Sequence, residues 1–195
     1  MSIYKTIQNE SHAEFKDRGS RFIAYTFGVS SKSGIEDALK KLAELHPKAR
    51  HVCYAYKLLN GEYRANDDGE PSGSAGLPIL NQIKSADVVN VLVAVVRYFG
   101  GTKLGVSGLI NAYKITANEA LIEAGLVEKE ETEKLTVVFD YGLMEAVMSF
   151  IKRNNVEIED NKYTEMCTLY VQIRKSQHHE FIQYFKNLGI KVSES

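Results

Sequence analysis

The stretch from residue 88 to residue 121, VVNVLVAVVRYFGGTKLGVSGLINAYKITANEAL, joins three patterns. Residues 88–96 form an almost continuous apolar run, which is typical of a central strand buried on both faces of a sheet. Residues 109–125 place apolar side chains at helical spacing and predict a helix of about four or five turns. A glycine-rich segment separates them. The order strand, loop, helix predicts the core of a mixed α and β domain.

The glycine-rich segment has features of an anion-binding site. The first N–H groups of a helix lack intrahelical partners and carry partial positive charge, so a loop that lets a ligand approach them can hold phosphate or carboxylate. The spacing matches neither GxGxxG nor a P-loop, so no nucleotide cofactor follows. Alternatively, the glycines only allow close packing of the helix on the sheet. The candidate binding residues are Arg97, Gly101, Thr102, Lys103, Gly105 and Ser107.

A second stretch, NDDGEPSGSAGLP at residues 66–78, brings three carboxylates together with small residues. One hypothesis is that Asp67 and Asp68 bind Mg²⁺ through a phosphate, which needs only one or two protein carboxylates. Another is that the acids orient Arg97 and Lys103 on the glycine-rich segment. The simplest alternative is an ordinary turn. The candidate residues of this acidic wall are Asp67, Asp68, Glu70, Ser72, Gly73 and Ser74.

No complete catalytic constellation is visible, and no catalytic residue is assigned. His51 begins an apolar strand and is a candidate acid–base group or a structural histidine. The serines near residue 73 lack the GxSxG elbow. Cys53 has no nearby partner that would activate it, and the sequence predicts that it and Cys167 are buried thiols. Four aromatic residues could stack on bases or belong to the core: Tyr54, Tyr56, Tyr98 and Phe99.

The chain from residue 134 onward predicts a second, smaller domain. Apolar alternation in KLTVVFDY indicates a strand that includes Tyr141, and LMEAVMSFIKRN has helical spacing. Two further strands, a helix capped by Ser176 and a short final strand follow, in the ferredoxin-like order βαββαβ. The charged stretch VEKEETEK at residues 127–134 predicts a connector. We therefore expect domains at residues 1–130 and 134–195.

Turn and cap signals divide the first domain. Strands are predicted on either side of residues 17–20, and Ser33 with Glu36 fits a capping box at the start of a helix. Asn60-Gly61 predicts a two-residue hairpin in which both positions have positive φ.

Composition limits the classes of partner and location. The chain has 24 basic and 25 acidic residues, with a net charge of −1. No global field therefore attracts nucleic acid or an anionic membrane, and a local patch would be needed. The N-terminus lacks the apolar region of a signal peptide, and the longest apolar run is too short to cross a bilayer. We expect a cytoplasmic protein with no membrane partner.

Four segments together resemble the IMPACT family in its two-domain, YigZ-like bacterial form: SRFIA, ARHVCYAY, NDDGEPSGSAGLPIL and VVRYFGGTKLGVSGL. The resemblance spans most of residues 1–125. It implies an α+β fold, with a first domain like domain 2 of ribosomal protein S-five. The second domain would resemble the last, ferredoxin-like domain of elongation factor G. It also implies a paired motif: Asp67, Asp68, Glu70, Pro71 and Gly73 with Arg97, Tyr98, Gly100, Gly101 and Lys103.

The family's eukaryotic members regulate translation by blocking activation of a starvation-sensing kinase through an extra RWD domain. We expect no RWD-type docking here, because the chain has no room for that domain. The resemblance implies a cytoplasmic, translation-linked regulator that binds RNA or a ribosome-associated protein through an anion-binding groove, with no cofactor. Two alternatives stay open: a Mg²⁺-assisted enzyme acting on a small phosphorylated or nucleotide-like molecule, and a protein-binding module without a small ligand.

Overall fold

The computed structural model describes residues 3–194 and divides into two compact units, with the chain boundary between Lys129 and Glu130. The N-terminal domain, residues 4–129, carries the long helix and the central strand described above. Its elements are β1 (Ile3–Ile7), β2 (Ser11–Asp17), β3 (Ser20–Gly28), α1 (Lys32–Leu45), β4 (His51–Lys57), β5 (Tyr63–Asn66), α2 (Gly76–Ser85), β6 (Val91–Tyr98), α3 (Gly105–Ala124) and β7 (Leu126–Glu130).

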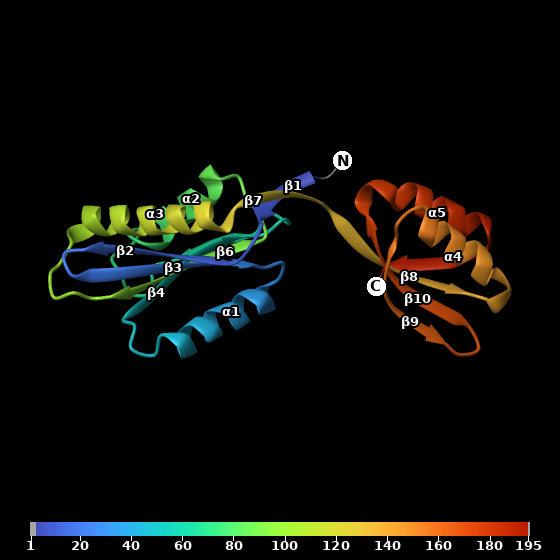
Figure 1. Cartoon of the computed structure of the whole chain (residues 1–195), viewed down its shortest axis with the longest axis horizontal. Helices are drawn as coiled ribbons and strands as arrows, with labels where there is room; N and C mark the ends of the chain where they lie inside the picture. The colour runs from blue at the N-terminus through green and yellow to red at the C-terminus, as the bar shows by residue number, and fades with distance from the viewer. Residues whose placement is uncertain (1–2, 195) are drawn as a thin grey trace. The chain divides into compact units, whose positions relative to one another are not determined.

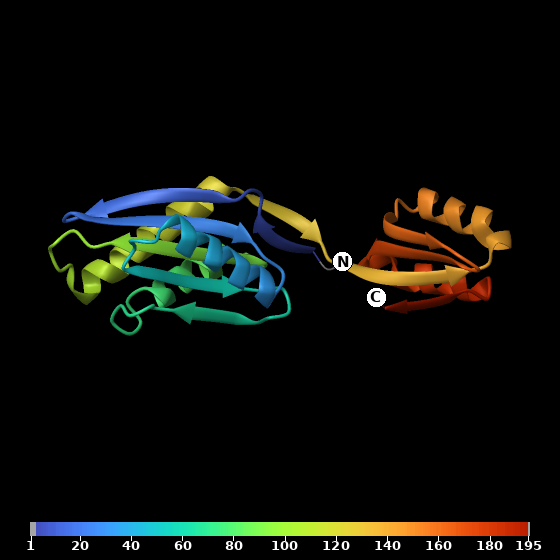
Figure 2. The ribbon, with the colours of Figure 1, turned by 90° about the horizontal axis from the view of Figure 1, so that it is seen from below.

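A five-stranded antiparallel sheet of order β2-β3-β6-β4-β5 organises this domain. Helices α2 and α3 cover one face, and α1 covers the other (Figures 1 and 2). Strand β6 lies at the centre, and all its residues from Val91 to Arg97 are buried. The predicted central strand is confirmed. Its apolar run is continuous because helices cover both of its faces.

Helix α3 is the largest single contributor to the core on its side of the sheet. Its buried positions include Leu109, Ala112, Tyr113, Ala117 and Leu121, the stripe expected from the sequence. The helix begins at Gly105 rather than near Leu109. Residues expected in the glycine-rich loop therefore lie in its first turn.

The C-terminal domain, residues 130–194, has the predicted ferredoxin-like fold. Its sheet has the antiparallel order β11-β8-β10-β9, with α4 and α5 on one face (Figure 1). The chain is thus an α+β protein, as expected. The elements are β8 (Thr132–Phe139), η1 (Tyr141–Leu143), α4 (Met144–Arg153), β9 (Glu157–Tyr163), β10 (Cys167–Arg174), η2 (Lys175–Gln177), α5 (His178–Asn187) and β11 (Lys191–Glu194).

Several local predictions were wrong. Ser31, not Ser33, caps α1, and its Oγ accepts a hydrogen bond from the Gly34 N–H at 3.2 Å. Ser176 caps no helix, because a 3₁₀ turn occupies residues 175–177 before α5 begins. Tyr141 lies beyond the end of β8 in another such turn.

The Asn60-Gly61 hairpin exists with a longer turn. Gly61 has a φ of 91°, whereas Asn60 is not in the positive-φ region. Leu58 and Glu62 close the loop by a 2.7 Å backbone hydrogen bond. This is the three-residue loop in which only the last position needs positive φ.

The predicted connector at residues 127–134 is largely extended. Strand β7 runs to Glu130, and β8 begins at Thr132. Glu130 and Glu131 form ion pairs with Arg174 and Lys175, and Glu133 contacts His178, so the charged residues of this stretch belong to the surface of the extended chain. Within residues 3–194, no helix is long and apolar enough to span a membrane.

Candidate functional site

A cavity of about 430 Å³ lies at the start of α3 in the N-terminal domain. Its polar wall is Arg50, His51, Glu70, Arg97 and Lys103. Its remaining wall is Pro71, Phe99, Leu104, Gly105, Val106 and Leu109. The expected proximity of the acidic stretch and the glycine-rich segment is therefore confirmed for Glu70 and Pro71. Whether the cavity binds a ligand stays a prediction.

A buried ion pair forms the inner wall of the cavity. Arg97 Nη1 donates to Glu70 Oε1 at 2.5 Å, and the two residues are only 6% and 8% exposed. The Arg97 guanidinium carbon lies 5.4 Å from the centre of the Phe22 ring and 5.6 Å from that of Phe99. Arg97 is thus the partner that the sequence predicted for one of the acids. Its Nε has no hydrogen-bond partner among the described residues.

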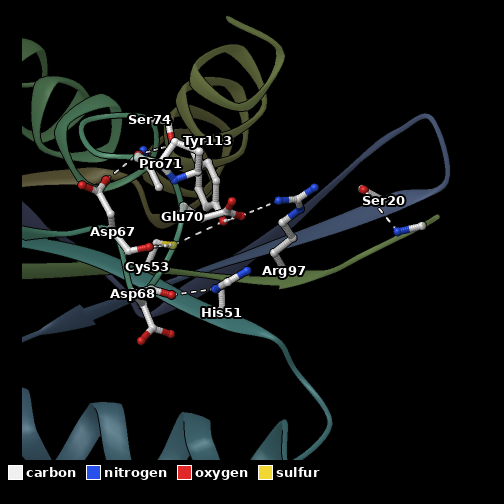
Figure 3. A network of polar contacts seen from close by, with 12 residues as sticks. Ser20, His51, Cys53, Asp67, Asp68, Glu70, Pro71, Ser74, Arg97 and Tyr113 are labelled. Carbon is white, nitrogen blue, oxygen red and sulfur yellow. Dashed lines mark hydrogen bonds and ion pairs between the residues drawn. The ribbon is translucent and has the colours of Figure 1, made fainter. Parts of the chain in front are cut away.

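Glu70 also binds a residue of the long helix. Tyr113 donates its hydroxyl proton to Glu70 Oε1 at 2.8 Å, so Glu70 lies between Tyr113 and Arg97 (Figure 3). Cys53 Sγ lies 3.3 Å from the Tyr113 hydroxyl and 3.0 Å from the Asp67 carbonyl oxygen, and its single proton is donated to one of them at a time. The network fixes the Glu70 carboxylate relative to α3.

Burial governs the ionisation of this network. It raises the pKa of the Cys53 thiol to about 12, and the hydrogen bond between Cys53 and Tyr113 partly opposes this by lowering that pKa. Burial also raises the pKa of the Tyr113 hydroxyl, and the neighbouring Cys53 and Glu70 add to this. Both groups are therefore neutral near pH 7. Cys53 is the buried, unactivated thiol that the sequence predicted, and Cys167 is buried as well.

Asp67 closes the start of α2. Its Oδ2 accepts from the Gly73 N–H at 2.8 Å, and its Oδ1 accepts from the N–H groups of Ala75 at 3.1 Å and Gly76 at 2.8 Å. An anion at a helix N-terminus satisfies unpaired donors and interacts favourably with the dipole. Here the protein supplies that anion itself, as the Asp67 carboxylate. The N–H groups that it accepts from belong to the small residues that follow it in the sequence.

Asp68 and His51 form a separate contact. Asp68 Oδ2 accepts from the Val52 N–H at 2.6 Å, and the Asp68 carbonyl oxygen lies 2.6 Å from His51 Nδ1. A carbonyl oxygen can only accept, so His51 Nδ1 carries a proton. In the neutral ring Nε2 is then an acceptor. His51 lines the cavity, whereas Figure 3 shows the Asp68 carboxylate pointing away from Glu70.

The start of α3 differs from that of α2. Leu104 is its N-cap residue and provides no side-chain hydrogen bond. Two exposed cations, Arg50 and Lys103, stand in the cavity wall beside it. Neither forms an ion pair within the part of the chain that the structure describes. The first turn of α3 thus adjoins a largely basic cavity and has no side-chain cap of its own.

The glycines serve different purposes. A Cβ at Gly100 would meet the Gly19 carbonyl carbon at 1.8 Å, and the Gly100 N–H donates to Ser20 Oγ at 3.3 Å. Gly100 therefore packs against the β2–β3 turn, which differs from the packing of helix on sheet that was the alternative. Gly101 and Gly105 have φ values of 90° and 73° in open space, so backbone conformation requires glycine there.

Some expected binding residues lie elsewhere. Tyr98 was wrongly placed in the site: its hydroxyl bonds to His46 Nδ1 at 2.9 Å, at the end of α1. Strand alternation explains this, because Arg97 and Tyr98 point to opposite faces of the sheet. The Ser74 hydroxyl donates to the Pro71 carbonyl oxygen at 2.6 Å and is buried. Five further candidates do not line the cavity: Gly101, Thr102, Ser107, Ser72 and Gly73.

The structure does not bring the expected magnesium ligands together. Asp67 faces the amides of α2, while Asp68 bonds to Val52. Glu70 binds Arg97 and Tyr113. Among residues 3–194, no cluster of three or more histidine, cysteine or acidic side chains could hold a metal ion.

Sequence reasoning missed Arg50 and Tyr113 as members of the site. Arg50 reaches the cavity because β4 pairs with β6 in the register His51 to Arg97, and the sequence does not state that register. Tyr113 belongs to the apolar stripe of α3, so the sequence indicates a core residue. Only its hydroxyl group suggests that it also takes part in a polar network.

The N-terminal domain is thus an α+β domain with an antiparallel sheet between helices and a basic cavity beside the long helix α3. The family model of the Impact N-terminal domain matches residues 18–121, which is more than half of the chain. The chain therefore belongs to the IMPACT family.

Three similar proteins illustrate the likeness. IMPACT family member YigZ of Escherichia coli (strain K12) is 30% identical over 170 residues, covering 85% of this chain and 82% of that protein. A crystal structure of a hypothetical protein is 24% identical, with a TM-score of 0.77 and coverage of 100% and 98% of the two chains. The two-domain translational regulator Yih1 is 32% identical, with a TM-score of 0.35 and coverage of 62% and 47%.

Proposed function

We propose that this chain is a cytoplasmic, translation-linked regulatory protein whose N-terminal domain binds an anionic group of RNA in the cavity at the start of α3. Membership of the IMPACT family supports the link to translation. The cavity supports the binding, since its wall holds the cations Arg50, Arg97 and Lys103 against a single carboxylate, Glu70. These cations form the local basic patch that a chain of near-zero net charge needs in order to attract RNA.

The start of α3 strengthens the attraction. Partial positive charge at a helix N-terminus adds to the field of the three cations, and backbone N–H groups bind phosphate oxygens. The cavity also opens beside apolar residues, so a base or sugar can follow the phosphate into it. A ribosome-associated protein that presents an acidic group would meet the same wall, and RNA is the partner to test first.

The test is RNA binding as a function of salt concentration. We expect Arg50→Ala and Lys103→Ala, singly and together, to weaken binding of a single-stranded RNA, with a slope of log affinity against log salt reduced by about 1 per lost phosphate contact. Lys114→Ala is the matched control, because it removes the same charge from an exposed position of α3 outside the cavity. Equal affinity and slope in the double variant and the control would exclude the cavity as the binding site.

Arg97→Ala is a poor probe, because it would leave Glu70 buried without its partner and lower stability. A Mg²⁺-assisted enzyme receives no specific support, because the hydrogen bonds above already engage the three carboxylates of the acidic stretch. A Mg²⁺ titration followed by thermal unfolding tests that alternative directly.

A further inference from the structure

The cavity is larger than a single anionic group requires. Its volume of about 430 Å³ falls in the range of pockets that enclose small organic ligands, about 300–1,000 Å³. One part of the wall is basic, and another is apolar and includes Phe99, Leu104, Val106 and Leu109. A ligand that fills it has an anionic group joined to an apolar or planar body.

The charges of the wall indicate the kind of anion. Glu70 already neutralises Arg97 through their 2.5 Å contact. Arg50 and Lys103 have no ion-pair partner in the described chain, so two positive charges are uncompensated. An internal phosphodiester of RNA carries one negative charge, whereas a phosphomonoester carries about −1.5 to −2 near pH 7. The monoester matches the wall, and the start of α3 adds to that preference.

Arg97 is a rigidly held part of the cavity wall. Its side chain is 93% buried and donates to Glu70 through Nη1, whereas the buried Nε has no hydrogen-bond partner among the described residues. Because the guanidinium is bonded to Glu70 and lies within 5.6 Å of the ring centres of Phe22 and Phe99, it is a fixed group in the cavity wall rather than a mobile surface charge.

The rest of the wall suits a nucleoside. Phe99 is 44% exposed and offers an aromatic face on which a base can stack. His51 donates from Nδ1 to the Asp68 carbonyl oxygen, so Nε2 of the neutral ring can accept from a sugar hydroxyl. Both side chains belong to the same cavity as the cations.

We infer that the cavity recognises a nucleoside phosphomonoester, either the phosphorylated end of an RNA chain or a free nucleoside monophosphate, rather than an internal RNA phosphate. The inference rests on the proposed function, in which this cavity binds an anionic group of RNA. It adds that the anion is a terminal dianion and that Phe99 contacts its base.

The experiment compares one short single-stranded RNA with four ends: 5′-phosphate, 3′-phosphate, 5′-hydroxyl, and 5′-phosphate blocked as a methyl ester. The methyl ester keeps the phosphate but removes one charge. Affinity is measured by fluorescence anisotropy with a dye at the opposite end, and adenosine 5′-monophosphate is added as a competitor. The protein is the full chain, with Arg50→Ala, Lys103→Ala and Phe99→Ala as variants and Lys114→Ala as the control.

We expect at least one phosphorylated end to bind about tenfold or more tightly than the hydroxyl and methyl-ester ends, with the preference reduced in the three variants and kept in the control. Equal binding of all four ends, weakened by Lys103→Ala, would overturn the inference while leaving RNA binding intact. Adenosine monophosphate competing as well as phosphorylated RNA would support the phosphomonoester and identify a small molecule as its source. Binding by none of the probes would overturn both proposals.

Discussion

The starts of α2 and α3 lie on the same side of one sheet, but the unpaired backbone N–H groups of their first turns are treated differently. At α2, Asp67 accepts hydrogen bonds from three backbone N–H groups, and a Cβ at Gly76 would meet the Asn66 backbone at 2.5 Å. That start is closed by protein. At α3 no side chain caps the first turn, and a basic cavity adjoins it. The difference indicates which helix start is built for stability and which is left for a ligand.

Glu70 connects the two regions, so its loss should have the largest effect. It precedes α2 in the chain and binds both Arg97 and Tyr113 beside α3. Glu70→Ala leaves the Arg97 charge buried without a partner, and we expect the free energy of unfolding to fall by about 3–5 kcal/mol. Chemical denaturation measures it. In the double variant Glu70→Leu, Arg97→Met no charge is stranded, so its loss should be smaller than that of Glu70→Ala. An equal or larger loss would contradict this account of the pair.

Two neighbouring aspartates test how much Asp67 stabilises the start of α2. Asp67→Ala removes an acceptor shared by three N–H groups, and we expect a loss of about 2 kcal/mol. Asp68→Ala removes an exposed acceptor of one N–H group, and we expect a loss of about 0.5–1 kcal/mol. Thermal or denaturant unfolding compares the two variants under identical conditions. Similar losses would mean that the start of α2 does not depend on Asp67.

The pKa of Cys53 tests whether water is excluded from the interior next to the start of α2. Its pKa is raised to about 12, while the thiol of the unfolded chain has a pKa near 9. Between these values the folded state keeps a proton that the unfolded state loses, so stability falls as pH rises. From pH 8 to pH 10 this residue should account for about 1 kcal/mol of the loss. Cys53→Ala should flatten the pH profile by that amount, and an unchanged slope would contradict the raised pKa.

Lys103→Ala should have the smallest effect on stability, because this exposed side chain makes no ion pair in the described structure. We expect the free energy of unfolding to change by less than about 0.5 kcal/mol while RNA binding weakens. A loss of stability as large as that of Asp67→Ala would mean that the start of α3 is also a structural site.

Patterns of apolar residues predicted most of the fold. The run at residues 88–96 and the stripe of α3 report burial directly, and so do the alternating strands of the C-terminal domain. Caps were less predictable. Serines stand at positions 31 and 33, and which one caps α1 depends on where β3 releases the chain.

The site was predictable in part. Chemistry pointed to Arg97, Lys103 and Glu70, which do line one cavity. The error at Tyr98 arose because a motif was treated as one surface, although consecutive residues of a strand face opposite ways. Arg50 could not be found in this manner, since only the pairing of β4 with β6 brings it to the cavity.

The contact between Gly19 and Gly100 links the cavity to the β2–β3 hairpin. Because two backbones touch there, a side chain at position 100 would push the hairpin turn and the loop carrying Lys103 apart. Sequence drift in one of these segments is therefore constrained by the other, even though residues 19 and 100 are far apart in the chain. A chimera that exchanges the loop between relatives should also exchange the turn.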